Sequence, residues 1–167
     1  TYPAQFLLVA ASNPCPCGYF GDTKRPCTCL PGTISRYQKR ISGPILDRID
    51  IHIEVPPVKY RDLSEHQVTE TSQAIKLRVE DARNIQRKRF DNLGINCNSQ
   101  MPSKLIKEHC ILNNEAKTLL RMAITELGVS ARGYDKLLKV SRTIADLRKA
   151  EIIAAEDIAE AIQYRSL

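Results

Sequence analysis

The residues best suited to chemistry lie close together near the start of the chain. Residues 13–29 read NPCPCGYFGDTKRPCTC and hold four of the six cysteines, as two C-x-C pairs separated by nine residues. Four thiolates at this spacing match the tetrahedral sulfur coordination of zinc, although the common structural site has two residues inside each pair. Such a site would be structural, because the protein fills every coordination position. The predicted ligands are Cys15, Cys17, Cys27 and Cys29.

Two other interpretations of these thiols stay open. A disulfide needs an oxidising compartment, and no signal peptide in the sequence indicates secretion. Alternatively, the thiols are redox-labile surface groups that bind no metal. The number of ligands and their spacing favour zinc over both. Cys97 and Cys110 are far away in the sequence and are predicted to be ordinary semi-buried thiols.

The segments around the cysteine loop predict the closing part of an α/β domain. Residues 6–11 (FLLVAA) form a continuous apolar run, typical of a strand that is covered on both faces. Residues 49–55 (IDIHIEV) alternate as a strand does, and two prolines follow. A short helix is expected between them, at 34–41. We therefore assign residues 1–58 to an incomplete parallel sheet domain, with the cysteine-rich loop at 13–32.

The rest of the sequence predicts helices. Residues 59–92 combine a linker with a long helix, expected from about 71 to 90. Residues 93–167 predict a small all-α bundle. The predicted N-caps and helix end of this bundle are Ser103, Asn113 or Asn114, Ser130 and Gly128.

The charge of the chain permits a nucleic-acid partner without requiring one. The net charge is +6, and cations cluster at 36–40 and at 83–89. Each cluster is also what a solvated helix face would show. DNA contacts are assigned to the end of the long helix, at Arg87, Lys88 and Arg89. No run of 18 apolar residues occurs, which predicts no membrane span and a cytoplasmic location.

Several longer motifs resemble one family. They are, in order, ASNPCPCGYFGD, RYQKRISGPILDRIDIHIEV, RVEDARNIQRKRF and SARGYDKLLKVSRTIADL, and they are similar to magnesium-chelatase-like AAA+ ATPases of the ComM/YifB type. The resemblance covers essentially the whole chain. It implies the C-terminal part of an AAA+ P-loop core followed by a helical lid bundle. It also implies a homo-oligomeric ring, a hexamer, that binds ATP with Mg²⁺.

The resemblance gives nucleotide-related roles to two residues of the first part. Asn13 matches the sensor 1 position, where an amide orients the attacking water without adding charge. The plain alternative is a residue that ends a strand before a proline. Arg48, in LDRID, matches an arginine finger that reaches the nucleotide of a neighbouring subunit. Its alternative is a salt bridge with Asp47 or Asp50.

A third role falls in the helical part. Arg132, in SARGYDKLL, matches the sensor 2 arginine at the start of a lid helix, where a helix N-terminus favours anions. The alternative is a surface arginine. A cation in the first turn of a helix is unfavourable by the dipole rule, which favours a functional placement.

The chain also departs from the family pattern. It holds no G-x-x-x-x-G-K-[ST] motif and no acidic Walker B segment, so we expect it to be a fragment that does not hydrolyse ATP alone. The predicted function of the whole protein is an ATP-hydrolysing motor on DNA, in competence or recombination, of the branch-migration helicase type. The alternatives are the ATPase subunit of a magnesium chelatase and a non-enzymatic, zinc-stabilised binding module.

Overall fold

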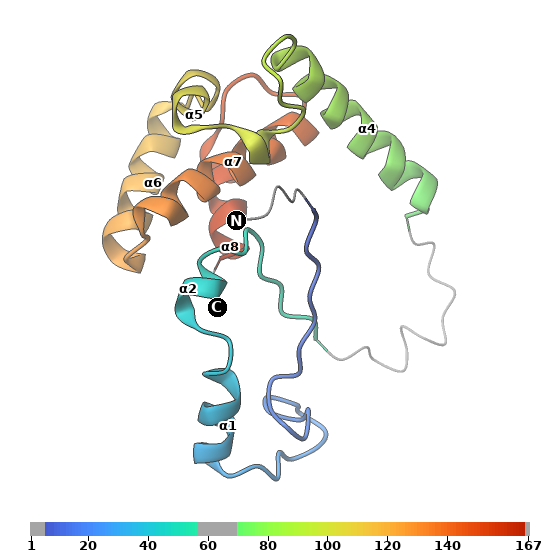
Figure 1. The fold of residues 1–167 in the computed structure, drawn as a ribbon, viewed down its shortest axis with the longest axis vertical. Helices are drawn as coiled ribbons and strands as arrows, with labels where there is room; N and C mark the ends of the chain where they lie inside the picture. The colour runs from blue at the N-terminus through green and yellow to red at the C-terminus, as the bar shows by residue number, and fades with distance from the viewer. Residues whose placement is uncertain (1–5, 57–69, 166–167) are drawn as a thin grey trace. The chain divides into compact units, whose positions relative to one another are not determined.

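The chain forms two compact units, Thr1–Leu46 and Asp47–Leu167, named here the cysteine unit and the helical unit. The computed structural model describes residues 6–56 and 70–165 (Figure 1). The linker predicted at the start of 59–92 falls mainly outside these described ranges. Among the described residues, no helix combines the length and apolar composition needed to cross a bilayer.

The cysteine unit has little apolar interior. An extended stretch leads into the cysteine loop, and helices α1 (Pro31–Gln38) and α2 (Gly43–Leu46) follow. Proline in the first turn of α1 suits a helix start, because its missing N–H would have no partner there. Cys15 and Ile34 are the buried apolar residues in the described part of this unit. The Gln38 side chain donates to the Pro14 carbonyl at 3.3 Å and so ties α1 to the loop.

The predicted sheet is absent from the part of the chain that the structure describes. Residues 6–11 and 49–55 have no strand partners, and the β-type pairing found is an isolated bridge between Leu112 and Ile153. A strand is stable only when a neighbouring strand completes its hydrogen bonds. The apolar side chains of both segments are therefore exposed, with Leu7 at 88% and Val55 at 81%. The residues that the structure describes therefore do not support the predicted incomplete parallel sheet.

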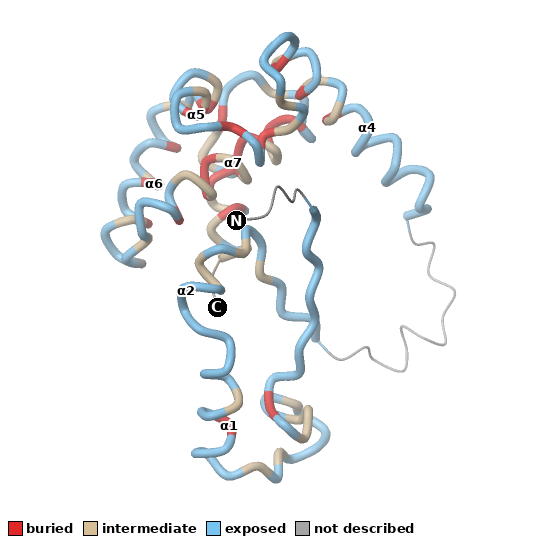
Figure 2. Tube along the Cα trace, in the orientation of Figure 1, coloured by how far each residue is buried: buried red, intermediate tan, exposed pale blue. Residues whose placement is uncertain are grey.

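The predicted helical bundle is confirmed in the helical unit. Its helices are α4 (Ser72–Arg89), the 3-10 helix η1 (Asn98–Gln100), α5 (Ser103–His109), α6 (Asn114–Leu127), α7 (Ala131–Leu147) and α8 (Ala155–Gln163). Helix α7 is central, since it packs against α4, α5, α8 and η1, while α6 packs against α8. Figure 2 shows buried residues concentrated along α7. The largest apolar side chains of this core are Phe90, Met101, Leu137, Ile153 and Ile158.

Capping residues set the ends of the central helices. The Asn113 side chain accepts from the Ala116 amide at 2.7 Å, and the Ser130 hydroxyl accepts from the Gly133 amide at 3.0 Å. Gly128 ends α6 in the left-handed conformation, with φ of 62°. These predictions are confirmed. Ser103 differs: it is the first residue of α5, which Pro102 precedes.

Helix α4 confirms the predicted long helix but is buried only toward its C-terminal end. Ala82 and Gln86 are buried, whereas Ile75 and Val79 are 42% and 46% exposed although they lie on the same predicted stripe. Figure 1 shows the first turns of α4 extending away from the other helices of the unit. The apolar spacing alone therefore overestimated how much of this helix packs.

Candidate functional site

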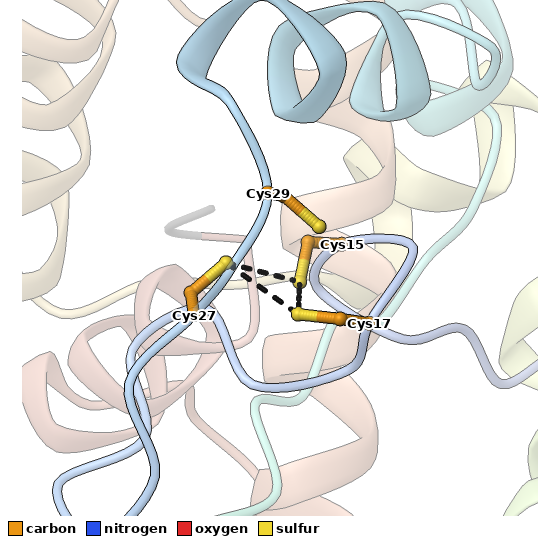
Figure 3. Close-up of side chains that lie close together, drawn as sticks. All are labelled: Cys15, Cys17, Cys27 and Cys29. Carbon is orange, nitrogen blue, oxygen red and sulfur yellow. Dashed lines mark hydrogen bonds between the residues drawn. The ribbon is translucent and has the colours of Figure 1, made fainter.

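The four predicted metal ligands converge on one point. Their Sγ atoms all lie within 4.8 Å of one another, and Figure 3 shows the sulfur atoms of Cys15, Cys17 and Cys27 facing one another with Cys29 beside them. The Sγ–Sγ distances are 3.3 Å for Cys15 to Cys17, 3.7 Å for Cys15 to Cys27 and 3.5 Å for Cys17 to Cys27. All six cysteines of the chain are free thiols, so the cross-link interpretation is not realised.

This arrangement fits a four-coordinate metal. Zinc–sulfur bonds of about 2.3 Å in a tetrahedron place sulfur atoms about 3.8 Å apart, close to the separations in the cluster. Gly18 and Gly21 both adopt φ of 84°, which lets the chain fold back and bring the second C-x-C pair to the first. Cys15 is fully buried, and its three partners are partly exposed. The donor set is thus compact and partly shielded from water.

Backbone amides divide the thiols by acidity. The amides of Tyr19 and Thr28 point at the Cys17 sulfur and lower the pKa of this thiol to about 6. The amide of Cys29 acts in the same direction on Cys27. Burial and the neighbouring thiols outweigh it and raise the pKa of Cys27 to about 12. One thiol therefore ionises first, and a divalent cation would displace the protons held by the others.

A second arrangement lies wholly inside the helical unit, where residues 47–52, named here the Arg48 segment, dock on α7 and on the two residues that follow α8. The Asp47 carboxylate accepts from the Ser130 hydroxyl at 3.0 Å and from the Arg165 guanidinium at 3.1 Å. The Lys136 ammonium lies 2.5 Å from the Asp50 carboxylate and also donates to the Arg48 carbonyl.

The other end of the Arg48 segment is held by the end of the chain. Arg165 donates to the Ile49 carbonyl at 3.2 Å, and the His52 amide donates to the Tyr164 carbonyl at 2.7 Å. The side chain of Arg165 is only 13% exposed. The sequence did not reveal this docking, because its partners are more than 80 residues apart and no local pattern marks such pairs.

The docking brings two of the predicted nucleotide-binding residues to one end of α7. Arg132 lies in the first turn of α7 and is exposed. The carbonyl of Arg48 is bound by Lys136, which follows one turn later on the same helix. Asn13 belongs to the cysteine unit, where it is exposed two residues before the buried Cys15. Arg48 and Arg132 therefore both belong to the helical unit, and the Arg48 backbone is bound one turn after Arg132 on α7.

The predicted DNA contacts at the end of α4 separate into two kinds. Arg87 and Lys88 are exposed. Arg89 points into the bundle instead, where its guanidinium donates to the Asp146 carboxylate at 2.7 Å and to the Asn98 side chain at 2.9 Å. Its charge is engaged in the fold, so the assignment of DNA contact is kept for Arg87 and Lys88 alone.

Comparison with known proteins covers the whole chain. The family described as "Magnesium chelatase, subunit ChlI C-terminal" matches residues 69–165, and "Magnesium chelatase, subunit ChlI" matches residues 1–63. The chain is 40% identical to the YifB protein of Escherichia coli (strain K12) over its full length. It is also 40% identical, over 99% of its length, to competence protein ComM of Haemophilus influenzae. The chain spans 32% of the length of each of these relatives. It therefore belongs to the magnesium chelatase ChlI family, whose C-terminal part it matches.

Proposed function

We propose that this chain is the C-terminal part of a cytoplasmic, ring-forming AAA+ ATPase that moves on DNA, as a helicase of the branch-migration type. The observation that supports the proposal is the docking of the Arg48 segment on Lys136 of α7, the helix whose first turn carries Arg132. A neighbouring subunit is needed because an arginine finger acts on the nucleotide of the next subunit, and the resemblance implies that the subunits form a hexameric ring. The name of the Haemophilus relative, a competence protein, supports a role in natural transformation.

The proposed roles follow from charge and hydrogen-bonding capacity. The Arg48 guanidinium would stabilise charge on the phosphoryl group transferred in the neighbouring site, and Arg132 would contact the phosphates of ATP at a helix start that favours anions. Asn13 would orient the attacking water through its amide. Segments upstream of this chain would hold ATP and Mg²⁺, since this sequence has no Walker motif.

The cysteine cluster would hold a structural Zn²⁺ through Cys15, Cys17, Cys27 and Cys29. When bound, the metal neutralises thiolate charge and fixes the loop, because all four coordination positions belong to the protein. Arg87 and Lys88, exposed on the last turn of α4, would contact DNA phosphates.

The decisive experiment uses the full-length protein, with the upstream segment restored. DNA-stimulated ATP hydrolysis is measured for wild type and for Arg48→Ala, Arg48→Lys and Arg132→Ala. We expect Arg48→Ala to lower turnover about 10³-fold, because arginine fingers contribute about 10³–10⁵ in rate. The present chain alone should show no hydrolysis. Wild-type turnover in Arg48→Ala, or hydrolysis by the present chain alone, would contradict the proposal.

The family description favours one second candidate, the ATPase subunit of a magnesium chelatase. That function requires a porphyrin-binding partner, so the partner should co-purify with the full-length protein, and porphyrin metallation should depend on ATP. If DNA stimulates the ATPase and no porphyrin-binding partner co-purifies, the result favours the DNA motor over the chelatase subunit. A non-enzymatic binding module would leave turnover unchanged when the present chain is mixed with intact subunits, whereas Arg48 supplied in trans should alter it.

A further inference from the structure

The positive charge of the protein is concentrated in the cysteine unit. Residues 1–46 hold five Lys or Arg side chains and one acidic side chain, Asp22, and so carry +4 of the net charge of +6. All five cations are exposed: Lys24, Arg25, Arg36, Lys39 and Arg40. The Asp22 carboxylate accepts from the amides of Lys24 and Arg25, at 2.6 and 3.1 Å, so it is occupied by its own loop.

The tip of the cysteine loop, residues 19–25, presents aromatic rings beside these cations. The Asp22 amide donates to the Tyr19 carbonyl at 3.1 Å, which closes a turn with Phe20 at its second position and Gly21, at φ of 84°, at its third. This geometry puts Phe20 on the outer corner of the turn, where its side chain is 49% exposed.

Arg25 is held in a defined place next to this corner. Its guanidinium lies 5.3 Å from the centroid of the Tyr19 ring and donates to the Tyr19 hydroxyl at 2.8 Å. A guanidinium held on an aromatic face by one hydrogen bond still has further N–H donors for a ligand. The four-cysteine cluster lies at the base of the same loop, where a bound metal would fix the tip.

We propose that the loop tip, residues 19–25, binds unpaired nucleotides, with Phe20 stacked on a base and Lys24 and Arg25 on the flanking phosphates. Exposed aromatic faces between cations are the chemistry by which proteins hold single strands, because every unpaired base offers a flat face. An acidic peptide would match the charge but would leave the aromatic face unused. The inference deepens the proposed function, on which it rests, by placing a strand contact outside α4.

Fluorescence anisotropy on the zinc-loaded chain tests this directly. The probes are labelled oligothymidylate and oligouridylate of about 16 nucleotides, and a duplex of equal length. Phe20→Leu should weaken binding about 5- to 150-fold, which is the range found when base stacking on an aromatic ring is lost, whereas Phe20→Tyr should keep the affinity. The double variant Lys24→Gln/Arg25→Gln should reduce the slope of log affinity against log salt by about 1.4. Lys104→Gln/Lys107→Gln, which removes two exposed charges from α5, should leave the slope unchanged.

The anisotropy results support or overturn the proposed strand contact as follows. Tighter binding of either single strand than of duplex supports the inference, and the oligouridylate arm tells whether DNA or RNA supplies the strand. No binding of single strands, wild-type affinity in Phe20→Leu, or polyglutamate bound as tightly as oligothymidylate would overturn it. Zinc content and circular dichroism of the variants check that the loop is intact. Failure here leaves the Arg48→Ala ATPase test untouched, so the two ideas fail separately.

Discussion

Asp146 is the residue on which the buried polar side chains of the helical unit converge. Its carboxylate, fully buried, accepts from Arg89 at 2.7 Å, from Asn98 at 2.8 Å and from Arg142 at 3.1 Å. Arg142 is itself 1% exposed and also donates to the Glu151 carbonyl at 2.6 Å. Two guanidinium charges thus depend on one carboxylate for compensation.

We predict that Asp146→Ala destabilises the helical unit by about 3–5 kcal/mol, because it leaves buried positive charge without a partner. Denaturant unfolding followed by circular dichroism measures the change. Asp81→Ala is the matched control, since Asp81 pairs with Lys149 on the surface at 2.7 Å, with both side chains more than half exposed. That exposed pair should contribute about 0–1 kcal/mol. Equal effects of the two substitutions would contradict the central role of Asp146.

Among the elements, α7 both centres the core and holds the Arg48 segment through Lys136. We predict that Lys136→Met lowers the ATP turnover of the full-length protein about 10²-fold, since a displacement of about 1 Å in a catalytic group costs that much. Lys136→Arg should retain most of the activity, because a cation still reaches Asp50. ATP affinity should change little in either variant, which separates positioning from nucleotide binding.

The matched control for Lys136 is Lys139→Met, on the same helix. Lys139 donates to the Ser99 carbonyl at 2.9 Å and makes no described contact with the Arg48 segment. The ATP turnover of the full-length Lys139→Met variant should stay close to that of wild type. If Lys136→Met and Lys139→Met behaved alike, the docking of the Arg48 segment would have no part in catalysis.

The sequence predicts the helices of the bundle well because their ends are marked locally. Asn113, Ser130 and Gly128 act through hydrogen bonds and dihedral angles that involve only their near neighbours. The cysteine cluster was predictable for the same reason, since its four ligands lie within one loop.

What the sequence could not predict depends on distant partners. Arg89 was predicted to contact DNA from the last turn of the long helix, but its partner, Asp146, lies 57 residues further on. The segment at residues 6–11 has the composition of a buried strand, yet burial requires neighbours that the described residues do not supply. Composition indicates what a segment can do, and packing decides whether it does so.

At the scale of the whole molecule, the two units differ in what stabilises them. The cysteine unit buries few apolar side chains in its described part, whereas the helical unit has an apolar core of its own. A small unit without a core needs a metal or cross-links. The stability of the cysteine unit should therefore depend on Zn²⁺, and that of the helical unit should not.

We predict about one Zn²⁺ per chain, bound by four thiolates. Its removal by a chelator should speed tryptic cleavage after Lys24 and leave the thermal transition of the helical unit unchanged. Cys17→Ser should reproduce the effect. Acidification should release the metal, because protons compete for the thiolates. An equal rate of tryptic cleavage with and without chelator would contradict the structural role assigned to the cluster.

The bare apolar segments have a consequence for how this chain behaves in concentrated solution. Phe6 to Val9 are 63% to 88% exposed, and Ile51, Ile53 and Val55 are exposed as well, all on extended backbone. Unpaired, apolar, extended stretches are templates on which a second chain can add a strand. Self-association through these stretches would limit the solubility of the chain. Neighbouring strands that paired with these stretches would cover them and so prevent the self-association.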